Sequence, residues 1–294
     1  MLKKAPWIKI KITTDSSKVR NIKNILKKNG LHSVCEEASC PNLSECFYNG
    51  SVTFMILGNI CTRNCSFCNV KHGRPKMFYP DKNEPKRLAK VISDMNLNYV
   101  VLTSVNRDDL HDGGAKHFTE CIKKIRLNNL SVRIEILVPD FKKSLNKSLK
   151  IISRELPDVF NHNIESVPRL YKKIRPGANY YGSLNLLKLF KENHPNLLTK
   201  SGLMVGLGET KNEIIKVMKD LRKCNVDILT IGQYLRPSRF HFPVKHYVTL
   251  EEFKFMENIA FSMGFTYVSC GPFVRSSYQA KFYKKTNLLN KNTK

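Results

Sequence analysis

From residue 51 onward, short apolar runs alternate with segments of helical periodicity. The apolar runs are continuous, which is typical of strands that are buried on both faces of a sheet. We expect strands at 53–57, 99–104, 132–138, 159–163, 199–205, 228–234 and 265–269. We expect helices at 87–95, 115–126, 143–154, 183–192, 211–224 and 250–263. This alternation predicts an α/β fold with a parallel sheet covered by helices, either open or closed into a barrel.

Several of the expected strands run into polar or glycine-rich turns, at 104–114, 161–166, 206–210 and 234–238. In a βα barrel the carboxyl ends of the strands face the active site, and an open doubly wound sheet follows a similar rule. We therefore expect the chemistry of this protein at these turns.

The first 50 residues lack this alternation and predict an irregular extension with one helix, 17–28, that stops near Gly30. Beyond Tyr278 the chain is rich in Lys and Asn and is expected to fray. We therefore divide the chain into an extension, 1–50, an α/β domain, 51–270, and a C-terminal segment, 271–294.

The composition bounds the class of protein. The 294 residues include 50 Lys and Arg against 24 Asp and Glu, a formal charge of +26, and 41% of them are hydrophobic. That apolar share excludes a wholly disordered basic chain. No stretch approaches the roughly 18 apolar residues of a membrane helix, and residues 1–15 do not have the pattern of a secretory signal. We expect a cytoplasmic protein with no membrane partner.

The positive charge is spread along the chain as single lysines and short pairs such as Lys123-Lys124. No familiar nucleic-acid-binding motif accompanies it, so we expect no nucleic-acid partner. Two interpretations remain: a compositional habit on solvated helix faces, or attraction to an acidic protein surface.

Six of the nine cysteines fall within residues 35–68, in two groups of three. An odd count clustered in this way favours a soft metal centre over disulfides. One group, Cys61-x3-Cys65-x2-Cys68, directly follows the first expected strand. Three thiolates on one loop suit three irons of a 4Fe–4S cube, whose fourth iron then stays open to chelate a small molecule. A zinc knuckle is the alternative, although zinc usually takes four ligands in paired spacings.

This loop resembles that of the radical S-adenosylmethionine (SAM) superfamily. The resemblance implies that the open iron holds SAM and that an electron from the cluster splits SAM into methionine and a 5′-deoxyadenosyl radical. Phe67 matches the aromatic position of the superfamily motif and is expected near the adenine.

The second group, Cys35-x4-Cys40-x5-Cys46, precedes the α/β domain, and Arg275-Ser276-Ser277-Tyr278 stands near the C-terminus. Together with the SAM loop, in this order, they resemble the lipoyl synthase family over almost the whole chain. The resemblance implies an auxiliary 4Fe–4S cluster held by the second group and Ser277, with Arg275 beside it. It also implies a partial (β/α)6-type TIM barrel with N-terminal and C-terminal extensions.

The implied reaction inserts two sulfur atoms at C6 and C8 of an octanoyl chain on a lysine, with the auxiliary cluster as the sulfur donor. The implied substrates are octanoylated lipoyl-carrier domains of 2-oxoacid dehydrogenase complexes and the glycine cleavage H-type protein. Further implied partners are an electron donor such as ferredoxin or flavodoxin and iron–sulfur carrier proteins. An oxygen ligand such as Ser277 binds iron more weakly than a thiolate, which suits a cluster that must surrender sulfide.

The strand-end turns supply the remaining candidates for SAM contacts. Gly113 and Gly114 let the backbone approach a ligand, or they belong to a helix-entry turn capped by Asp112. Asn163 and Glu165 are candidates for the SAM ribose or amine, and Arg175 for its carboxylate, which a guanidinium binds with two hydrogen bonds.

The remaining histidines are not expected to act as ligands or bases, since hydrogen abstraction by a radical needs no general base. We expect His72, His111, His162 and His241 either behind the residues that contact the ligands or at the surface. We expect Cys121 and Cys224 to be core thiols.

Two other functions compete with this assignment. One is a radical SAM methylthiotransferase acting on tRNA, which is expected to carry an added RNA-binding domain. The other is a non-catalytic iron–sulfur or zinc protein whose affinity for RNA falls steeply with salt.

Overall fold

The computed structural model describes residues 3–10, 16–278 and 280. Within these residues lies an eight-stranded sheet whose strands follow one another in chain order. The strands are β1 (His32–Ser33), β2 (Thr53–Ile56), β3 (Tyr99–Ser104), β4 (Arg133–Leu137), β5 (Val159–Asn161), β6 (Leu198–Val205), β7 (Ile228–Gln233) and β8 (Tyr267–Gly271). β1 pairs antiparallel with β2, and each later strand pairs in parallel with the one before it. Among the described residues β1 and β8 do not pair, so the sheet stays open.

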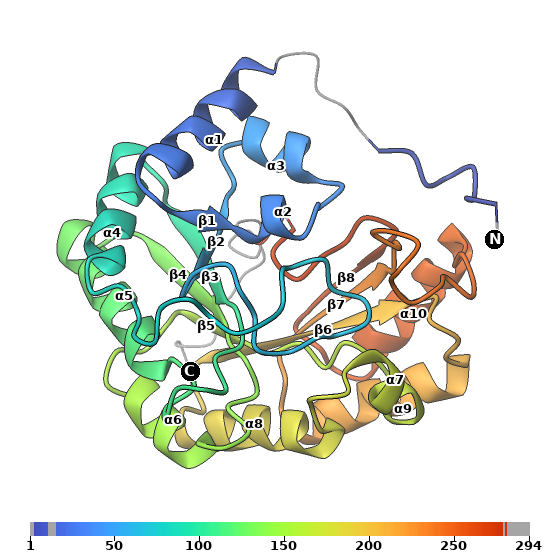
Figure 1. The fold of residues 1–294 in the computed structure, drawn as a ribbon. Helices are drawn as coiled ribbons and strands as arrows, with labels where there is room; N and C mark the ends of the chain where they lie inside the picture. The colour runs from blue at the N-terminus through green and yellow to red at the C-terminus, as the bar shows by residue number, and fades with distance from the viewer. Residues whose placement is uncertain (1–2, 11–15, 279, 281–294) are drawn as a thin grey trace, which may run out of the picture.

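Each step from β2 to β8 passes through a helix, and these helices form an outer layer around the sheet (Figure 1). They are α4 (Glu84–Asp94), α5 (Ala115–Asn128), α6 (Leu145–Ile152), α8 (Tyr180–Asn193), α9 (Lys211–Lys223) and α10 (Leu250–Ser262). The short η1 (Pro168–Leu170) and α7 (Tyr171–Ile174) precede α8. The result is six strand–helix units followed by β8, which confirms the partial (β/α)6-type barrel. The sequential strand order excludes a doubly wound sheet, whose strand order reverses at a switch point.

The helix and strand boundaries follow local signals in the sequence. α1 (Ser17–Lys28) has the expected bounds. α4 begins at Glu84, three residues before the expected 87, because Pro85 is well tolerated in the first turn, where its missing N–H has no helical partner. α9 starts with a capping box in which Thr210 and Glu213 bond each other's backbone N–H.

The interior of the sheet holds an ion pair as well as apolar side chains. Lys200 of β6 donates to both carboxylate oxygens of Glu135 at 2.9 and 3.1 Å, and both side chains have no exposed surface. Tyr99 and Asn161 also donate to this carboxylate, at 2.7 and 2.8 Å. The charges are thus paired and hydrogen-bonded, as burial requires.

The N-terminal extension is more ordered than expected. Besides α1 and β1 it forms α2 (Val34–Glu37) and α3 (Leu43–Tyr48), and these elements lie together beside β2 (Figure 1). Ser33 caps α2 by accepting a hydrogen bond from Glu36 N, and the ring of Phe47 in α3 is fully buried. The expected fraying tail lies, apart from Ala280, outside the described residues. None of the described helices is both long and apolar enough to span a membrane.

Candidate active site

The first cysteine loop begins where β2 ends. Leu57 and Gly58 have positive φ angles of 70° and 84°, which turn the chain out of the strand. The loop then closes on itself, because Cys61 N donates to Lys71 O and Gly73 N donates to Cys61 O, both at 2.8 Å. The cysteines at 61, 65 and 68 are thereby held at one end of a cavity of about 630 Å³ that they line.

Arg63, inside this loop, anchors it to the strand ends. Its guanidinium donates two hydrogen bonds each to Asp108 and Asp140, at 2.6 to 2.7 Å. Burial alone would lower the pKa of Arg63, but the hydrogen bonds to the two carboxylates outweigh it and raise the pKa above its usual value. Arg63 is not among the residues predicted from the sequence. Its position between Cys61 and Cys65, together with acidic residues in the turns after β3 and β4, could have indicated that it forms an ion pair there.

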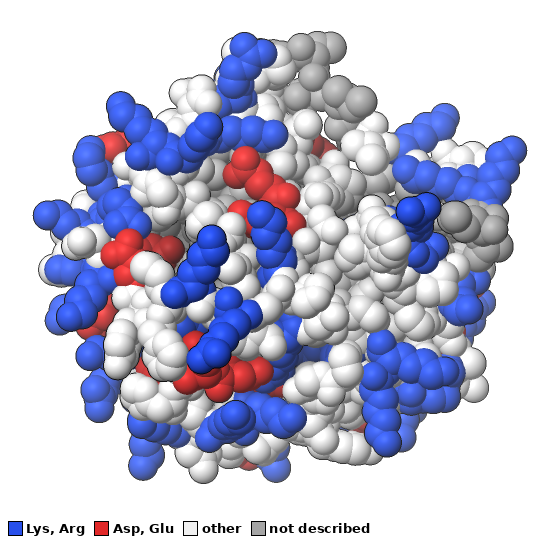
Figure 2. All heavy atoms as spheres, in the orientation of Figure 1, with Lys and Arg blue, Asp and Glu red and all other residues white. Residues whose placement is uncertain are grey.

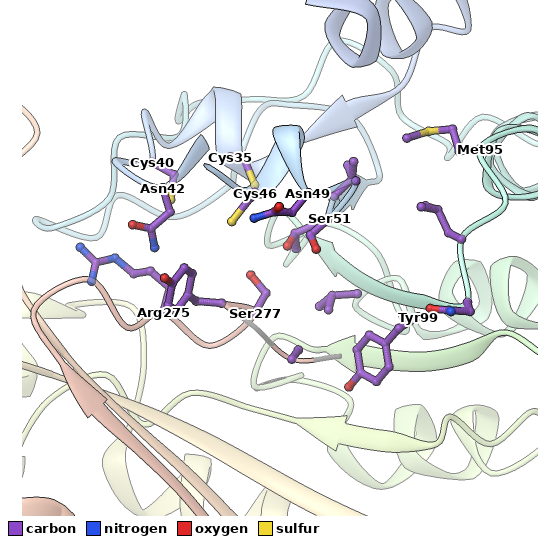
Figure 3. A pocket seen from close by; sticks show the side chains of 18 of the residues that line it. Cys35, Cys40, Asn42, Cys46, Asn49, Ser51, Met95, Tyr99, Arg275 and Ser277 are labelled. Atoms are coloured by element: carbon purple, nitrogen blue, oxygen red, sulfur yellow. The ribbon is translucent and has the colours of Figure 1, made fainter. Parts of the chain in front are cut away.

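The second cysteine group and the C-terminal segment line a smaller cavity of about 240 Å³. Cys35 lies in α2, Cys46 lies in α3, and Cys40 lies in the turn between these helices. Figure 3 shows the hydroxyl of Ser277 directed toward the side on which Cys35 and Cys46 lie, with Arg275 next to Ser277. The structure therefore brings together residues that are more than 200 positions apart in the sequence.

Two hydrogen bonds fasten the C-terminal segment to the extension. Asn42 Nδ2 donates to Phe273 O at 2.6 Å, and the Tyr278 hydroxyl donates to Glu45 Oε1 at 3.1 Å. These contacts flank Arg275 and Ser277, so they fix where the two side chains meet the cysteines. The closure of the smaller cavity thus depends on both ends of the chain.

The two cavities share a wall. Cys35, Cys40, Arg275 and Ser277 line both of them, whereas Cys46 lines only the smaller one. The larger cavity also contains the predicted SAM-side residues Phe67, Asn163, Glu165 and Arg175. Two cysteines of the second group, Cys35 and Cys40, therefore line the same cavity as all three cysteines of the first loop.

Gly113 and Gly114 are placed elsewhere. Neither is among the described residues that line the two cavities. A Cβ on Gly114 would meet Leu57 Cδ1 at 2.3 Å, and Asp112 accepts hydrogen bonds from Gly114 N and Lys116 N at the start of α5. Core packing thus accounts for the small size of Gly114 at this helix-entry turn, and a contact of either glycine with SAM stays a prediction.

Arg175, Asn163 and Glu165, which were predicted to contact SAM, are held in place by hydrogen bonds within the protein. Arg175 Nη1 donates to Asn163 O at 3.0 Å and to the Tyr171 hydroxyl at 3.1 Å. Asn163 Nδ2 donates to Glu165 Oε1 at 3.0 Å. Burial raises the pKa of Glu165, while Arg175 and Arg275 act in the opposite direction. Two cations, Arg175 and Arg275, and one carboxylate, Glu165, therefore line the larger cavity together.

The cysteines fit an iron–sulfur cube by donor chemistry. Burial raises the pKa of both Cys35 and Cys68 to about 12, and it also raises the pKa of Cys65. Thiols held this way become thiolates only beside a strong cation, which bound iron supplies. In the described part of the chain no three His, Cys, Asp or Glu side chains converge to hold one metal ion. In a cube each thiolate binds a different iron, so such convergence is not required.

Two of the predicted histidines contact protein atoms, and two of the remaining cysteines lie in the core. His162 is fully buried between Val138 O and Ser183 Oγ, and His241 Nε2 lies 3.1 Å from Cys68 O. Cys121 and Cys224 are buried in the hydrophobic core, as predicted.

The face of the molecule drawn in Figure 2 is basic. Figure 2 shows Lys and Arg side chains spread over the visible face, with Asp and Glu in a few small groups between them. This distribution follows from the formal charge of +26 and has no single focus on this face.

Comparison with known proteins agrees with this geometry. The model of the radical SAM superfamily matches residues 55–221. The chain is 62% identical over 280 residues to a lipoyl synthase from Proteus mirabilis, covering 95% of this chain and 87% of that protein. It is 61% identical over 285 residues to a lipoyl synthase from Klebsiella pneumoniae, covering 97% and 88%. Its fold is similar to that of the FeFe-hydrogenase maturase HydG from Carboxydothermus hydrogenoformans, with a TM-score of 0.56 at 16% identity, covering 88% and 72%.

Proposed function

The chain belongs to the lipoyl synthase family of the radical SAM superfamily, and from this premise we propose a specific reaction. The enzyme replaces one C–H bond at C6 and one at C8 of an octanoyl chain by C–S bonds. The octanoyl chain is amide-linked to a lysine of a lipoyl-carrier domain. The observation that carries this proposal is the shared cavity, which Cys35, Cys40 and Ser277 line together with all three cysteines of the SAM loop.

We propose two 4Fe–4S clusters and SAM as cofactors. The SAM-binding cluster is held by Cys61, Cys65 and Cys68, and the auxiliary cluster by Cys35, Cys40, Cys46 and Ser277. When bound, the first cluster and SAM supply a radical that abstracts hydrogen, and the second cluster supplies the sulfur atoms. The weaker oxygen ligand, Ser277, leaves one corner of the auxiliary cluster exchangeable.

The surrounding residues bind and orient SAM. The guanidinium of Arg175 carries five N–H donors, of which two contact Asn163 O and Tyr171, and it is the partner for the SAM carboxylate. Asn163 and Glu165 bind the amine or ribose, and Phe67 packs near the adenine. The apolar side chains of the larger cavity, among them Leu137 and Leu203, shield the radical from solvent and from stray hydrogen donors dissolved in it.

The two ends of the chain serve the auxiliary cluster. In this proposal the extension, 1–50, supplies its cysteines, the barrel, 51–270, supplies the SAM site, and the segment 271–294 closes the auxiliary site through Ser277. Arg275 adds positive charge beside the cluster, which carries negative charge when it is ligated by thiolates.

Partners follow from the same reaction. The substrates are octanoylated carrier domains of 2-oxoacid dehydrogenase complexes and the glycine cleavage H-type protein, in the cytoplasm. A ferredoxin or flavodoxin delivers electrons, and iron–sulfur carrier proteins rebuild the spent cluster. Attraction between the +26 chain and acidic carrier domains speeds docking, so turnover on a whole carrier domain should fall as ionic strength rises.

The test is anaerobic reconstitution followed by iron and sulfide counting. The protein is then incubated with SAM, a reductant and an octanoyl-lysine peptide, and the peptide is analysed by mass spectrometry. We expect two four-iron clusters per chain and a peptide that gains two sulfur atoms. One cluster per chain, or an unmodified peptide despite SAM cleavage, would overturn the proposal. Salt-sensitive binding to bulk RNA without SAM cleavage would favour the non-catalytic alternative.

A further inference from the structure

A chain of hydrogen bonds connects the C-terminal segment to the SAM side of the larger cavity. Ser276 Oγ donates to Asn163 Oδ1 at 2.6 Å, and Asn163 Nδ2 donates to Glu165 Oε1 at 3.0 Å. Ser276 and Asn163 are 113 residues apart in the sequence. The Asn163 amide therefore contacts both Ser276, in the segment that carries Ser277, and Glu165, which is proposed to bind SAM.

The backbone beneath this chain leaves it little freedom. A Cβ on Gly202 would lie 2.7 Å from both Asn163 Oδ1 and Ser276 Oγ, so the pair rests directly on the β6 backbone. Glu165 has a φ of 66° and is held there by Glu165 N donating to Gly202 O and Met204 N donating to Glu165 O. A non-glycine residue in this left-handed conformation is strained and persists only where its surroundings enforce it.

Ser276 is also tied to the auxiliary site. Its neighbour Ser277 lines both cavities, whereas Ser276 lines only the larger one. The Asn42–Phe273 and Tyr278–Glu45 hydrogen bonds hold the segment on either side. A displacement of the Ser277 backbone relative to the auxiliary cysteines is passed on to Ser276, since one peptide bond joins the two residues.

We propose that Ser276 is a positioning residue that couples the seating of Ser277 at the auxiliary site to the affinity of the SAM site. When Ser277 is in place at the auxiliary site, the hydrogen bond from Ser276 holds the Asn163 amide, and the hydrogen bond from Asn163 orients the Glu165 carboxylate for SAM. When the auxiliary cluster is lost, these hydrogen bonds weaken and the affinity for SAM falls. The enzyme thereby limits SAM cleavage when no sulfur is left to transfer. This inference rests on the proposed function.

The expected size of the effect follows from the contacts. Couplings between two sites typically change affinity 5- to 150-fold. Here the link is one neutral hydrogen bond, Ser276 to Asn163, which corresponds to about a fivefold change in binding. Because coupling is reciprocal, bound SAM should also stabilise the seated segment by the same factor.

The test is a double-mutant cycle on SAM binding. Wild type, Cys46→Ala, Ser276→Ala and the double variant are reconstituted anaerobically, and their dissociation constants for SAM are measured by equilibrium dialysis. Cys46 is chosen because it lines only the smaller cavity, so its removal leaves the lining of the SAM cavity unchanged. Tyr278→Phe is the matched control, since it loosens the same segment without touching Asn163.

We expect Cys46→Ala to weaken SAM binding about fivefold in the wild-type background and not at all in the Ser276→Ala background. The inference would be overturned if Cys46→Ala changed the dissociation constant for SAM by the same factor in both backgrounds, or did not change it in either. So would a Tyr278→Phe variant that abolishes the coupling as fully as Ser276→Ala, because general loosening would then explain the effect. Failure of the wild type to bind SAM would instead refute the proposed function.

Discussion

Gly232 offers a way to disturb the closing segment without touching any proposed ligand. Gly232 of β7 is the register partner of Gly271 in β8. A Cβ on Gly232 would lie 2.0 Å from Val274 O and 3.0 Å from Arg275 Nη1, whereas a Cβ on Gly271 would meet only Val274 Cγ2, at 3.4 Å. Gly232→Ala and Gly271→Ala are therefore a matched pair in which only the first forces the segment away.

The displacement can be estimated from the contact distance. For an ordinary contact of 3.4 Å the Val274 carbonyl must recede by about 1.4 Å, and the hydrogen bond that Arg275 Nη1 donates to it, at 2.6 Å, is disturbed as well. Overpacking of this kind costs about 1–3 kcal/mol of stability. A shift of about 1 Å at a reacting centre lowers rates by roughly 10²-fold.

The assay compares lipoyl-peptide formation and SAM cleavage in the two variants after anaerobic reconstitution. We expect Gly232→Ala to lose sulfur insertion by about 10²-fold while it retains SAM cleavage within about tenfold, and Gly271→Ala to behave like the wild type. Circular dichroism and thermal unfolding verify that both variants fold. If the two variants insert sulfur equally well, the seating of the segment against β7 does not matter for the reaction and our reasoning is wrong.

Three further predictions concern single side chains. Ser277→Ala should lower sulfur insertion at least about tenfold while SAM cleavage persists, and Ser277→Cys should retain the auxiliary cluster but slow sulfur release, as measured by iron counting and product mass. Lys200→Met should destabilise the fold by about 3–5 kcal/mol in denaturant titrations, because it leaves Glu135 buried without its cation, and pairing it with Glu135→Gln should recover part of the loss. Burial lowers the pKa of His162 to about 4, so between pH 6.5 and 4 the unfolded chain binds a proton that the folded chain does not. Stability should therefore fall with decreasing pH, by at most about 1.4 kcal/mol per pH unit from this group, and a pH dependence of unfolding unchanged in His162→Asn would contradict the assignment.

The sequence by itself determined where most strands and helices lie and how the cysteines are grouped. Both are short-range properties of the sequence. Hydrophobic periodicity indicates which face of a segment is buried, and the spacing of cysteines 61–68 indicates that one short loop carries all three thiols. For this reason the expected strands and helices lie at or within a few residues of β2–β8 and their helices. The short helices α2 and α3 were missed because four to six residues are too few to display a period.

The tertiary structure decided which distant residues meet. Only the strand order separates the open barrel from a doubly wound sheet, and only packing puts Ser276 on Asn163. The same holds for the contact between Gly114 and Leu57, which explains in the folded chain why position 114 must be small. The family resemblance implied that Ser277 meets cysteines 35–46, and in the folded chain these residues line the same cavity. Contacts across more than 50 residues depend on how the whole chain closes, and no local pattern of residues encodes that closure.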